Sequence, residues 1–320
     1  MDAVREIADA VLYEGYVLWP YRRSALKNTR RFTFGGVYPP AHSGAHPDDP
    51  AFMQTEVLVE GGPGARVDVR VRFLQVVRRQ LYRGGEPVDV LTLGGERYVS
   101  WDEAREREVA AVSTLGAPVR VPIAIAAGRD EEALGERSIV RTWHALEGGV
   151  TVAAEPVADG VHRLTVRIEN RTPFGGETHE EALERTFCST HTILRARNAA
   201  LVSATAPPAA LRAAAEACRN EGAWPVLVGE PGERHTMLSA PIILEEYPRV
   251  APESPGDLFD GGEIDQLLTL NILSLTDEEK AEMRASDPRA RAILDRTEAL
   301  SEEELMRLHG AIRDLRVVRP

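Results

Sequence analysis

The sequence predicts an α+β protein with a predominantly antiparallel, sandwich-like β core, a short N-terminal helix and an acidic helical C-terminal appendage. Apolar and polar residues alternate in several runs, most regularly at 161–169, as is typical of strands with one buried face. No long helical segments lie regularly between these runs, which disfavours a parallel βαβ fold. After Pro248 the composition changes, and residues 251–310 hold 15 acidic and 6 basic side chains.

This change of composition suggests how the 320 residues are organised. We expect a β-rich core with the N-terminal helix and a loop over 1–247, and an acidic helical segment over 248–320 packed on that core. A single domain over 1–320 is the alternative, since both sizes lie within the range of natural domains.

The net charge of −12 argues against generic duplex binding and against adhesion to an anionic membrane. No run of about 18 uncharged apolar residues is present, and the N-terminus does not have the pattern of a secretory leader. Two cysteines do not make a disulfide framework, and the reduced state is the default. We therefore expect a cytoplasmic protein with no nucleic-acid partner and no membrane insertion.

In the first half of the chain, residues 2–12 show the apolar spacing of one helical face. Residues 38–50 are rich in Pro and Gly, which predicts a loop. The alternation at 52–60 and 66–81, separated by Gly61-Gly-Pro-Gly64, predicts a hairpin. Ser100 and Glu103 form a capping-box pattern, which predicts a short helix through Val112.

In the second half, a capping-box pattern at Thr178 and Glu181 predicts a helix over 179–185. We expect a further helix over 207–219, which begins with two prolines. The predicted strands are 119–126, 138–146, 150–156, 161–169, 187–197, 224–228 and 241–246. The predicted C-terminal helices are 262–270, 276–285, 287–300 and 301–315.

Residues 13–38 are unlike the rest of this aromatic-poor, acidic chain. They hold four of the seven tyrosines. Aromatic and arginine side chains are enriched in binding hot spots, but the same residues would also anchor the N-terminal helix on the β core, and both interpretations stay open. The residues of interest are Tyr13, Glu14, Tyr16, Trp19, Tyr21, Arg22, Arg23, Lys27, Arg30 and Arg31.

A second unusual stretch, 251–265, is a Pro- and Gly-rich loop with five carboxylates. They are Glu253, Asp257, Asp260, Glu263 and Asp265. Dense carboxylates bind hard cations or arginine-rich surfaces, although the spacing fits no calcium loop and a capped structural loop is the simpler interpretation. We expect these carboxylates to meet the arginines of 22–31, so that the two stretches form one surface.

Few residues suggest metal binding. Cys188 and His191 are of ligating types, with His179 and Glu181 shortly before them, but on a strand their odd spacing directs them to opposite faces. A buried Cys and a hydrogen-bonded His are the simpler interpretation. His42 and His46 have i, i+4 spacing, but among prolines and glycines this indicates an exposed linker. Phosphate loops, dinucleotide fingerprints and nucleophile elbows are absent from the sequence. We predict no catalytic residue and no cofactor.

Two strings carry a resemblance to a known family. LYEGYVLWPYRRSALKN (12–28) and SAPIILEEYPRVAPESPGDLFDGGEID (239–265) resemble an uncharacterised bacterial accessory-protein family encoded with actinobacterial-type, high-affinity [NiFe]-hydrogenase gene clusters. The resemblance implies a cytoplasmic role in making or operating the hydrogenase, and it supplies no catalytic residue.

From these observations we expect a non-catalytic accessory protein that assists maturation or assembly of a [NiFe]-hydrogenase by binding a hydrogenase subunit or a maturation factor. One alternative is a metal-handling or hydrolytic enzyme that uses the 253–265 carboxylates or Cys188 and His191. Another is a structural subunit of a larger assembly. The sequence does not indicate an oligomeric state.

Overall fold

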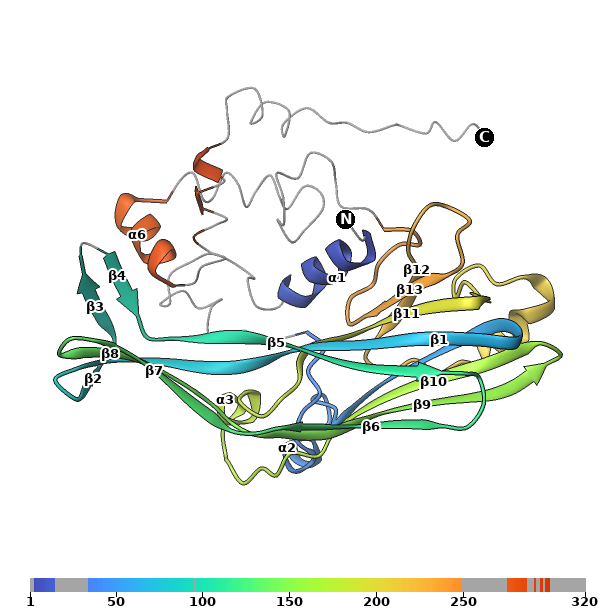
Figure 1. Ribbon diagram of the computed structural model, residues 1–320, viewed down its shortest axis with the longest axis horizontal. Coiled ribbons are helices and arrows are strands. Elements are labelled where there is room, and N and C mark those ends of the chain that lie inside the picture. Colours follow the sequence, from blue (N-terminus) through green and yellow to red (C-terminus); the bar gives the residue numbers. More distant parts are fainter. Residues whose placement is uncertain are drawn as a thin grey trace.

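In a computed structural model, the protein is a mostly antiparallel β structure with a few short helices, as the sequence predicts (Figure 1). The structure describes residues 3–14, 34–94, 96–248, 275–286, 291, 294, 295 and 297–299. Within these ranges, the strands are β1 Phe52–Arg83, β2 Glu86–Val88, β3 Val90–Leu93, β4 Glu96–Val99, β5 Trp101–Ser113, β6 Val119–Ile125, β7 Gly128–Leu134, β8 Arg137–Trp143, β9 Leu146–Ala158, β10 Val161–Asn170, β11 Cys188–Leu201, β12 Trp224–Leu227 and β13 Thr236–Ala240. The helices are α1 Ala3–Glu14, α2 Pro40–Ala45, α3 His179–Leu183, η2 Ala209–Leu211, α4 Arg212–Glu216 and α6 Asp277–Ser286.

The whole sheet is organised around β1, which pairs with five other strands. Its first part pairs with β10, its middle with β11 and β5, and its last part with β8 and β2. The main path of the sheet runs β12-β13-β11-β1-β10-β9-β6. The main apolar core joins side chains of β1 and β11 with those of β6, β9 and β10. In Figure 1 the strands β6, β9 and β10 form a layer below β1 and β5.

The predicted hairpin at 52–60 and 66–81 is wrong, because β1 continues through Gly61–Gly64. The ladder with β11 spans this point, with Gly61 opposite Ala199 and Arg66 opposite Arg197, and the intervening residues form an irregularity. Gly64 has a φ of 83°, which glycine adopts without steric cost. The glycines therefore mark a bulge inside one long strand rather than a turn between two.

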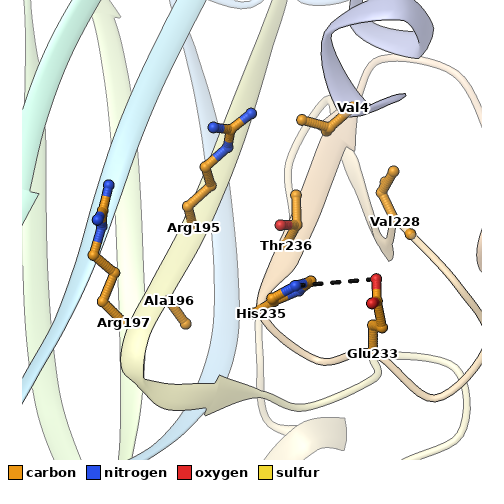
Figure 2. Close-up of a pocket in the computed structure, with 9 residues that line it drawn as sticks. Val4, Arg195, Ala196, Arg197, Val228, Glu233, His235 and Thr236 are labelled. Atoms are coloured by element: carbon orange, nitrogen blue, oxygen red, sulfur yellow. Dashed lines mark ion pairs between the residues drawn. The ribbon is translucent and has the colours of Figure 1, made fainter. Parts of the chain in front are cut away.

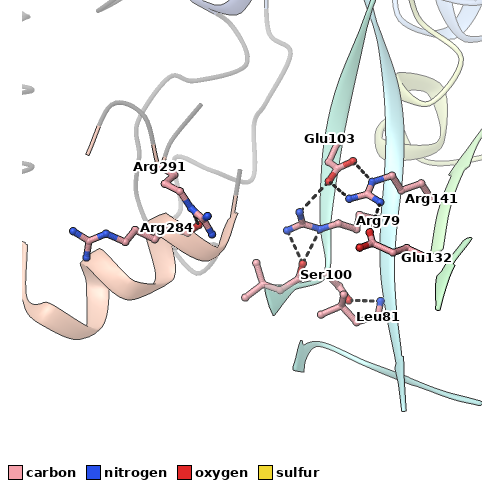
Figure 3. Close-up of polar contacts among 9 residues, drawn as sticks. Arg79, Leu81, Ser100, Glu103, Glu132, Arg141, Arg284 and Arg291 are labelled. Carbon is pink, nitrogen blue, oxygen red and sulfur yellow. Dashed lines mark hydrogen bonds and ion pairs between the residues drawn. The ribbon is translucent and has the colours of Figure 1, made fainter. Parts of the chain in front are cut away.

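The predicted helix that begins at the Ser100 capping box is also wrong, since these residues form β5. Glu103 of β5 accepts hydrogen bonds from Arg79 Nη1 at 2.9 Å and from Arg141 Nε at 2.7 Å (Figure 3). Arg79 also donates to the Val99 carbonyl, and the Ser100 hydroxyl binds backbone of the neighbouring strands. These cross-strand contacts along β1 outweigh the helical propensity of an Ala- and Glu-rich segment.

Several other elements agree with the sequence prediction. Helix α1 buries its predicted apolar face against β11 and β13. The capping box at Thr178 is present at α3, and Thr276 and Glu279 make reciprocal backbone contacts at α6. Helix α6 lies against β4 at one end of the sheet.

Three further predictions differ from the structure. The 207–219 helix is shorter, as η2 and α4. The strand predicted at 241–246 is wrong, because these residues are bends and irregular chain that follow β13, Thr236–Ala240. The predicted loop at 38–50 contains α2, which starts with Pro40. The predicted helices 262–270 and 301–315 lie outside the described residues.

Candidate metal centre

The binding surface predicted from sequence falls almost entirely outside the described residues. Tyr13 and Glu14 belong to the last turn of α1. The remaining predicted residues all lie outside the described ranges: Tyr16, Trp19, Tyr21, Arg22, Arg23, Lys27, Arg30, Arg31, Glu253, Asp257, Asp260, Glu263 and Asp265. The expected meeting of the arginine and carboxylate stretches therefore stays a prediction.

Cys188 and His191 do not point to opposite faces, contrary to the prediction from their spacing. Cys188 is opposite Leu74 and His191 is opposite Arg72, so three steps on β11 match two steps on β1. Ser189 has a φ of 50° at this bulge. Directly opposed residues lie on the same face of a sheet, so the extra residue brings Cys188 and His191 onto one face.

This bulge is nevertheless unsuited to a cation. Burial among apolar side chains raises the pKa of the Cys188 thiol. Burial, together with the neighbouring Arg72 guanidinium, lowers the pKa of His191 to about 3. His191 Nδ1 donates to the Ser189 carbonyl at 3.1 Å. In the part of the chain that the structure describes, neither residue belongs to a group of three converging ligands.

A different set of ligating side chains does converge, and it begins with α2. Pro40 occupies the first helical position, where the missing N–H costs nothing. The chain then turns back, because His46 N–H donates to the His42 carbonyl and Asp49 N–H donates to the His46 carbonyl, both at 3.0 Å. This turn carries the Asp49 carboxylate to the buried ring of His42, with His42 Nε2 and Asp49 Oδ2 2.8 Å apart.

The third member comes from α3, far along the chain. His179 is the first residue of this helix, which the Thr178–Glu181 capping box fixes in place. Its Nδ1 lies 3.5 Å from Asp49 Oδ2. The two segments are held together by a bridge between Val37 and Phe187, so a histidine near residue 40 and one near residue 180 face the same carboxylate oxygen.

The ligand atoms of His42, Asp49 and His179 all lie within 4.8 Å of one another. Accessibility rises across the set: the exposed fraction of the side chain is 2 % for His42, 24 % for Asp49 and 50 % for His179. The group is therefore anchored on its inner side and open on its outer side.

Aromatic rings surround the group. Tyr38 stacks on His42 with centroids 5.2 Å apart, and Phe174 meets the same ring edge-on at 5.9 Å. Burial raises the pKa of Tyr38, and the nearby Cys188 and Asp49 raise it further, so its phenol stays neutral. This packing fixes the orientation of the His42 ring.

Two imidazoles and one carboxylate form a donor set that suits borderline divalent ions such as Zn²⁺, Fe²⁺, Ni²⁺ and Co²⁺. Three protein ligands leave coordination positions for a further ligand. The sequence prediction noticed His42 and His179 separately but did not connect them. Helix α2 was not predicted. Because 38–50 was interpreted as an exposed linker, the turn that brings Asp49 to His42 was not predicted either.

A cavity of about 380 Å³ lies elsewhere, between α1, β11 and the segment before β13 (Figure 2). Its arginines are Arg195 and Arg197. Arg197 Nε donates to Asp68 at 2.7 Å, and Glu233 lies opposite with its carboxylate 4.0 Å from His235. The cavity is thus lined by both cationic and anionic side chains.

No protein-family model matches this chain, and no curated protein matches it either. Within the ranges that the structure describes, no helix has both the length and the apolar character needed to cross a membrane.

Proposed function

We propose that this protein is a metal-binding accessory protein that holds a divalent transition-metal ion between His42, Asp49 and His179. The observation that carries the proposal is the convergence of two imidazoles on one oxygen, Asp49 Oδ2, from helices about 140 residues apart in sequence. Imidazole nitrogens and carboxylate oxygens commonly bind the same metal ion. An ion bound between them would account for the convergence of these three side chains.

A second pair in the same chain shows why the third ligand matters. His144 Nε2 and Glu184 Oε2 lie 2.8 Å apart, the same separation as His42 and Asp49. In the described ranges, no second imidazole joins this pair within ligating distance. A lone His–carboxylate contact is an ordinary hydrogen-bonded pair, and His144 therefore serves as a matched control.

The accessory role rests on the resemblance of 12–28 and 239–265 to proteins encoded with [NiFe]-hydrogenases. We propose that the partner is a hydrogenase subunit or a maturation factor, bound through protein–protein contacts. Nickel and iron are both ions that imidazole ligands accept, which makes the proposed centre compatible with that setting.

Metal titration tests the centre directly. Isothermal titration of the metal-free protein with Zn²⁺, Ni²⁺ and Co²⁺ is expected to give one site, and Mg²⁺ is expected not to bind because it prefers oxygen ligands. Loss of outer-shell partners costs metal sites about 10–100-fold in affinity, so His42→Ala or His179→Ala is expected to cost at least as much. His144→Ala is expected to bind like the wild type. Equal affinity in His42→Ala and the wild type would refute the centre.

The accessory role has its own test. A tagged protein expressed in a hydrogenase-producing strain is expected to retain hydrogenase subunits or maturation factors, and deletion is expected to lower hydrogenase activity. Recovery of the bait alone, together with normal hydrogenase activity in the deletion strain, would contradict this role without bearing on metal binding.

A further inference from the structure

A third imidazole, that of His46, lies directly beside the candidate centre. The rings of His42 and His46 are nearly parallel, with an interplanar angle of 14° and centroids 4.2 Å apart. This is shorter than the 5.6 Å between the rings of His42 and His179. His46 is nevertheless outside the set of three converging ligands. The centre thus has a neighbour of ligating type that does not take part in the resting arrangement.

The contacts of His46 leave one nitrogen ready to bind an ion. Its Nδ1 lies 3.1 Å from the His42 carbonyl oxygen. A carbonyl only accepts, so Nδ1 carries the proton, and in the neutral ring Nε2 then has a free lone pair. Metal-binding histidines usually donate their other ring N–H to a carbonyl or carboxylate in this way.

The position of His46 suits an ion that enters or leaves. His42 is buried, whereas His46 is exposed and follows the end of α2. His179, by contrast, is fixed at the start of α3 by the capping box. The exposed side of the centre is therefore bordered by one imidazole on a capped helix and one on a turn after a helix.

We infer that His46 is a transfer ligand, through which a divalent ion passes between the centre and solvent or a partner protein. The inference rests on the proposed metal centre. In each exchange one metal–nitrogen bond to His46 Nε2 forms as one bond to Asp49 or His179 breaks, so the metal keeps its oxidation state. Because His46 binds the ion only during passage, it changes the rates of loading and release more than the affinity.

Release kinetics test this role. The full-length protein is loaded with Zn²⁺ and mixed with an excess of a chromogenic chelator in a stopped-flow instrument. His46→Ala is expected to release the ion about tenfold more slowly, which corresponds to about 1.4 kcal/mol in the barrier, with its equilibrium Kd within about twofold of the wild type.

A second variant separates ligation from stacking. His46→Phe keeps an aromatic ring against His42 but has no nitrogen, so it is expected to release as slowly as His46→Ala. Ser43→Ala, on the same helix, is expected to release like the wild type. Wild-type release rates in His46→Phe would overturn the inference, and so would a loss of affinity above about tenfold in both variants, since that would make His46 a resting ligand.

The outcome for the wild type distinguishes the two proposals. If the wild-type protein binds no Zn²⁺, Ni²⁺ or Co²⁺ in titration, the proposed centre fails and the transfer role fails with it. If the wild type binds an ion and the His46 variants release it at the wild-type rate, the transfer role alone is wrong.

Discussion

Two regions of the molecule contain histidine beside another ligating residue, and they differ in what surrounds the histidine nitrogen. At the candidate metal centre, two imidazoles face the Asp49 carboxylate, and the outer side is open. At the bulge of β11, His191 lies next to the Arg72 guanidinium, and the Cys188 sulfur packs against leucine and valine. One region gathers donors around a negative charge, and the other buries them beside a positive one.

The difference shows that residue type alone does not identify a metal site. Cys and His are as good ligands as His and Asp, and the bulge even places Cys188 and His191 on the same face. A cation at the bulge would lose its hydration and meet a guanidinium, whereas at Asp49 it would meet a carboxylate. Charge and access therefore distinguish the two regions.

The largest expected effect concerns stability with metal. Ion binding to the native state at 100 times the Kd adds about 2.7 kcal/mol to the free energy of unfolding. We expect this gain with Zn²⁺ in urea-induced unfolding of the wild type and of His191→Gln. We expect His42→Ala to lose most of it, because the buried imidazole is absent.

The comparison would break if His191→Gln lost the gain and His42→Ala kept it. The bulge would then be the metal site in spite of its neighbouring guanidinium. Mg²⁺ at the same concentration serves as a control for the general effect of a divalent salt.

The next effect concerns pH. The pKa of His191 is lowered to about 3, below the ordinary value of about 6.5, so the unfolded chain binds a proton at a pH where the native protein does not. The contribution of neutral His191 to the free energy of unfolding is therefore fully present above about pH 6.5 and is lost as the pH falls toward 3. At pH 5 the loss is about 2 kcal/mol.

Other groups also titrate over this interval, so the measurement compares slopes. Urea unfolding of the wild type and of His191→Gln at pH 7.5, 6 and 5 is expected to show a smaller loss of stability in the variant. Parallel slopes would mean that His191 is already accessible to protons in the native protein.

The sequence predicted the strands well wherever alternation was clean, as at β10, because one buried face leaves a local pattern. It failed where distant contacts decide. Residues 101–113 have helical composition, but they pair along β1 as a strand, and Arg72 and Arg79 of β1 form ion pairs with their glutamates. Predicting the candidate centre requires two features that residue spacing does not reveal. One is the turn after α2 that returns Asp49 to His42, and the other is the tertiary contact that brings residue 179 to residue 42.

The smallest expected effect concerns the two cysteines. Cys188 is fully buried, and Cys218 is partly exposed. Cys188→Ser places a hydroxyl among Leu12, Leu74 and Val76. Burying an unpaired hydroxyl costs up to about 3 kcal/mol, but the Thr186 carbonyl, 3.7 Å from the sulfur, offers an acceptor, and we expect a loss of about 1 kcal/mol.

The same substitution at the partly exposed position provides the control. Cys218→Ser is expected to change the free energy of unfolding by less than about 0.5 kcal/mol, as is usual at the surface. Both variants are expected to bind Zn²⁺ with wild-type affinity, because neither cysteine faces the Asp49 carboxylate. A Cys188→Ser protein that is stable but no longer binds the ion would show that the sulfur is a ligand, and the contrast between the open carboxylate centre and the closed bulge would then be wrong.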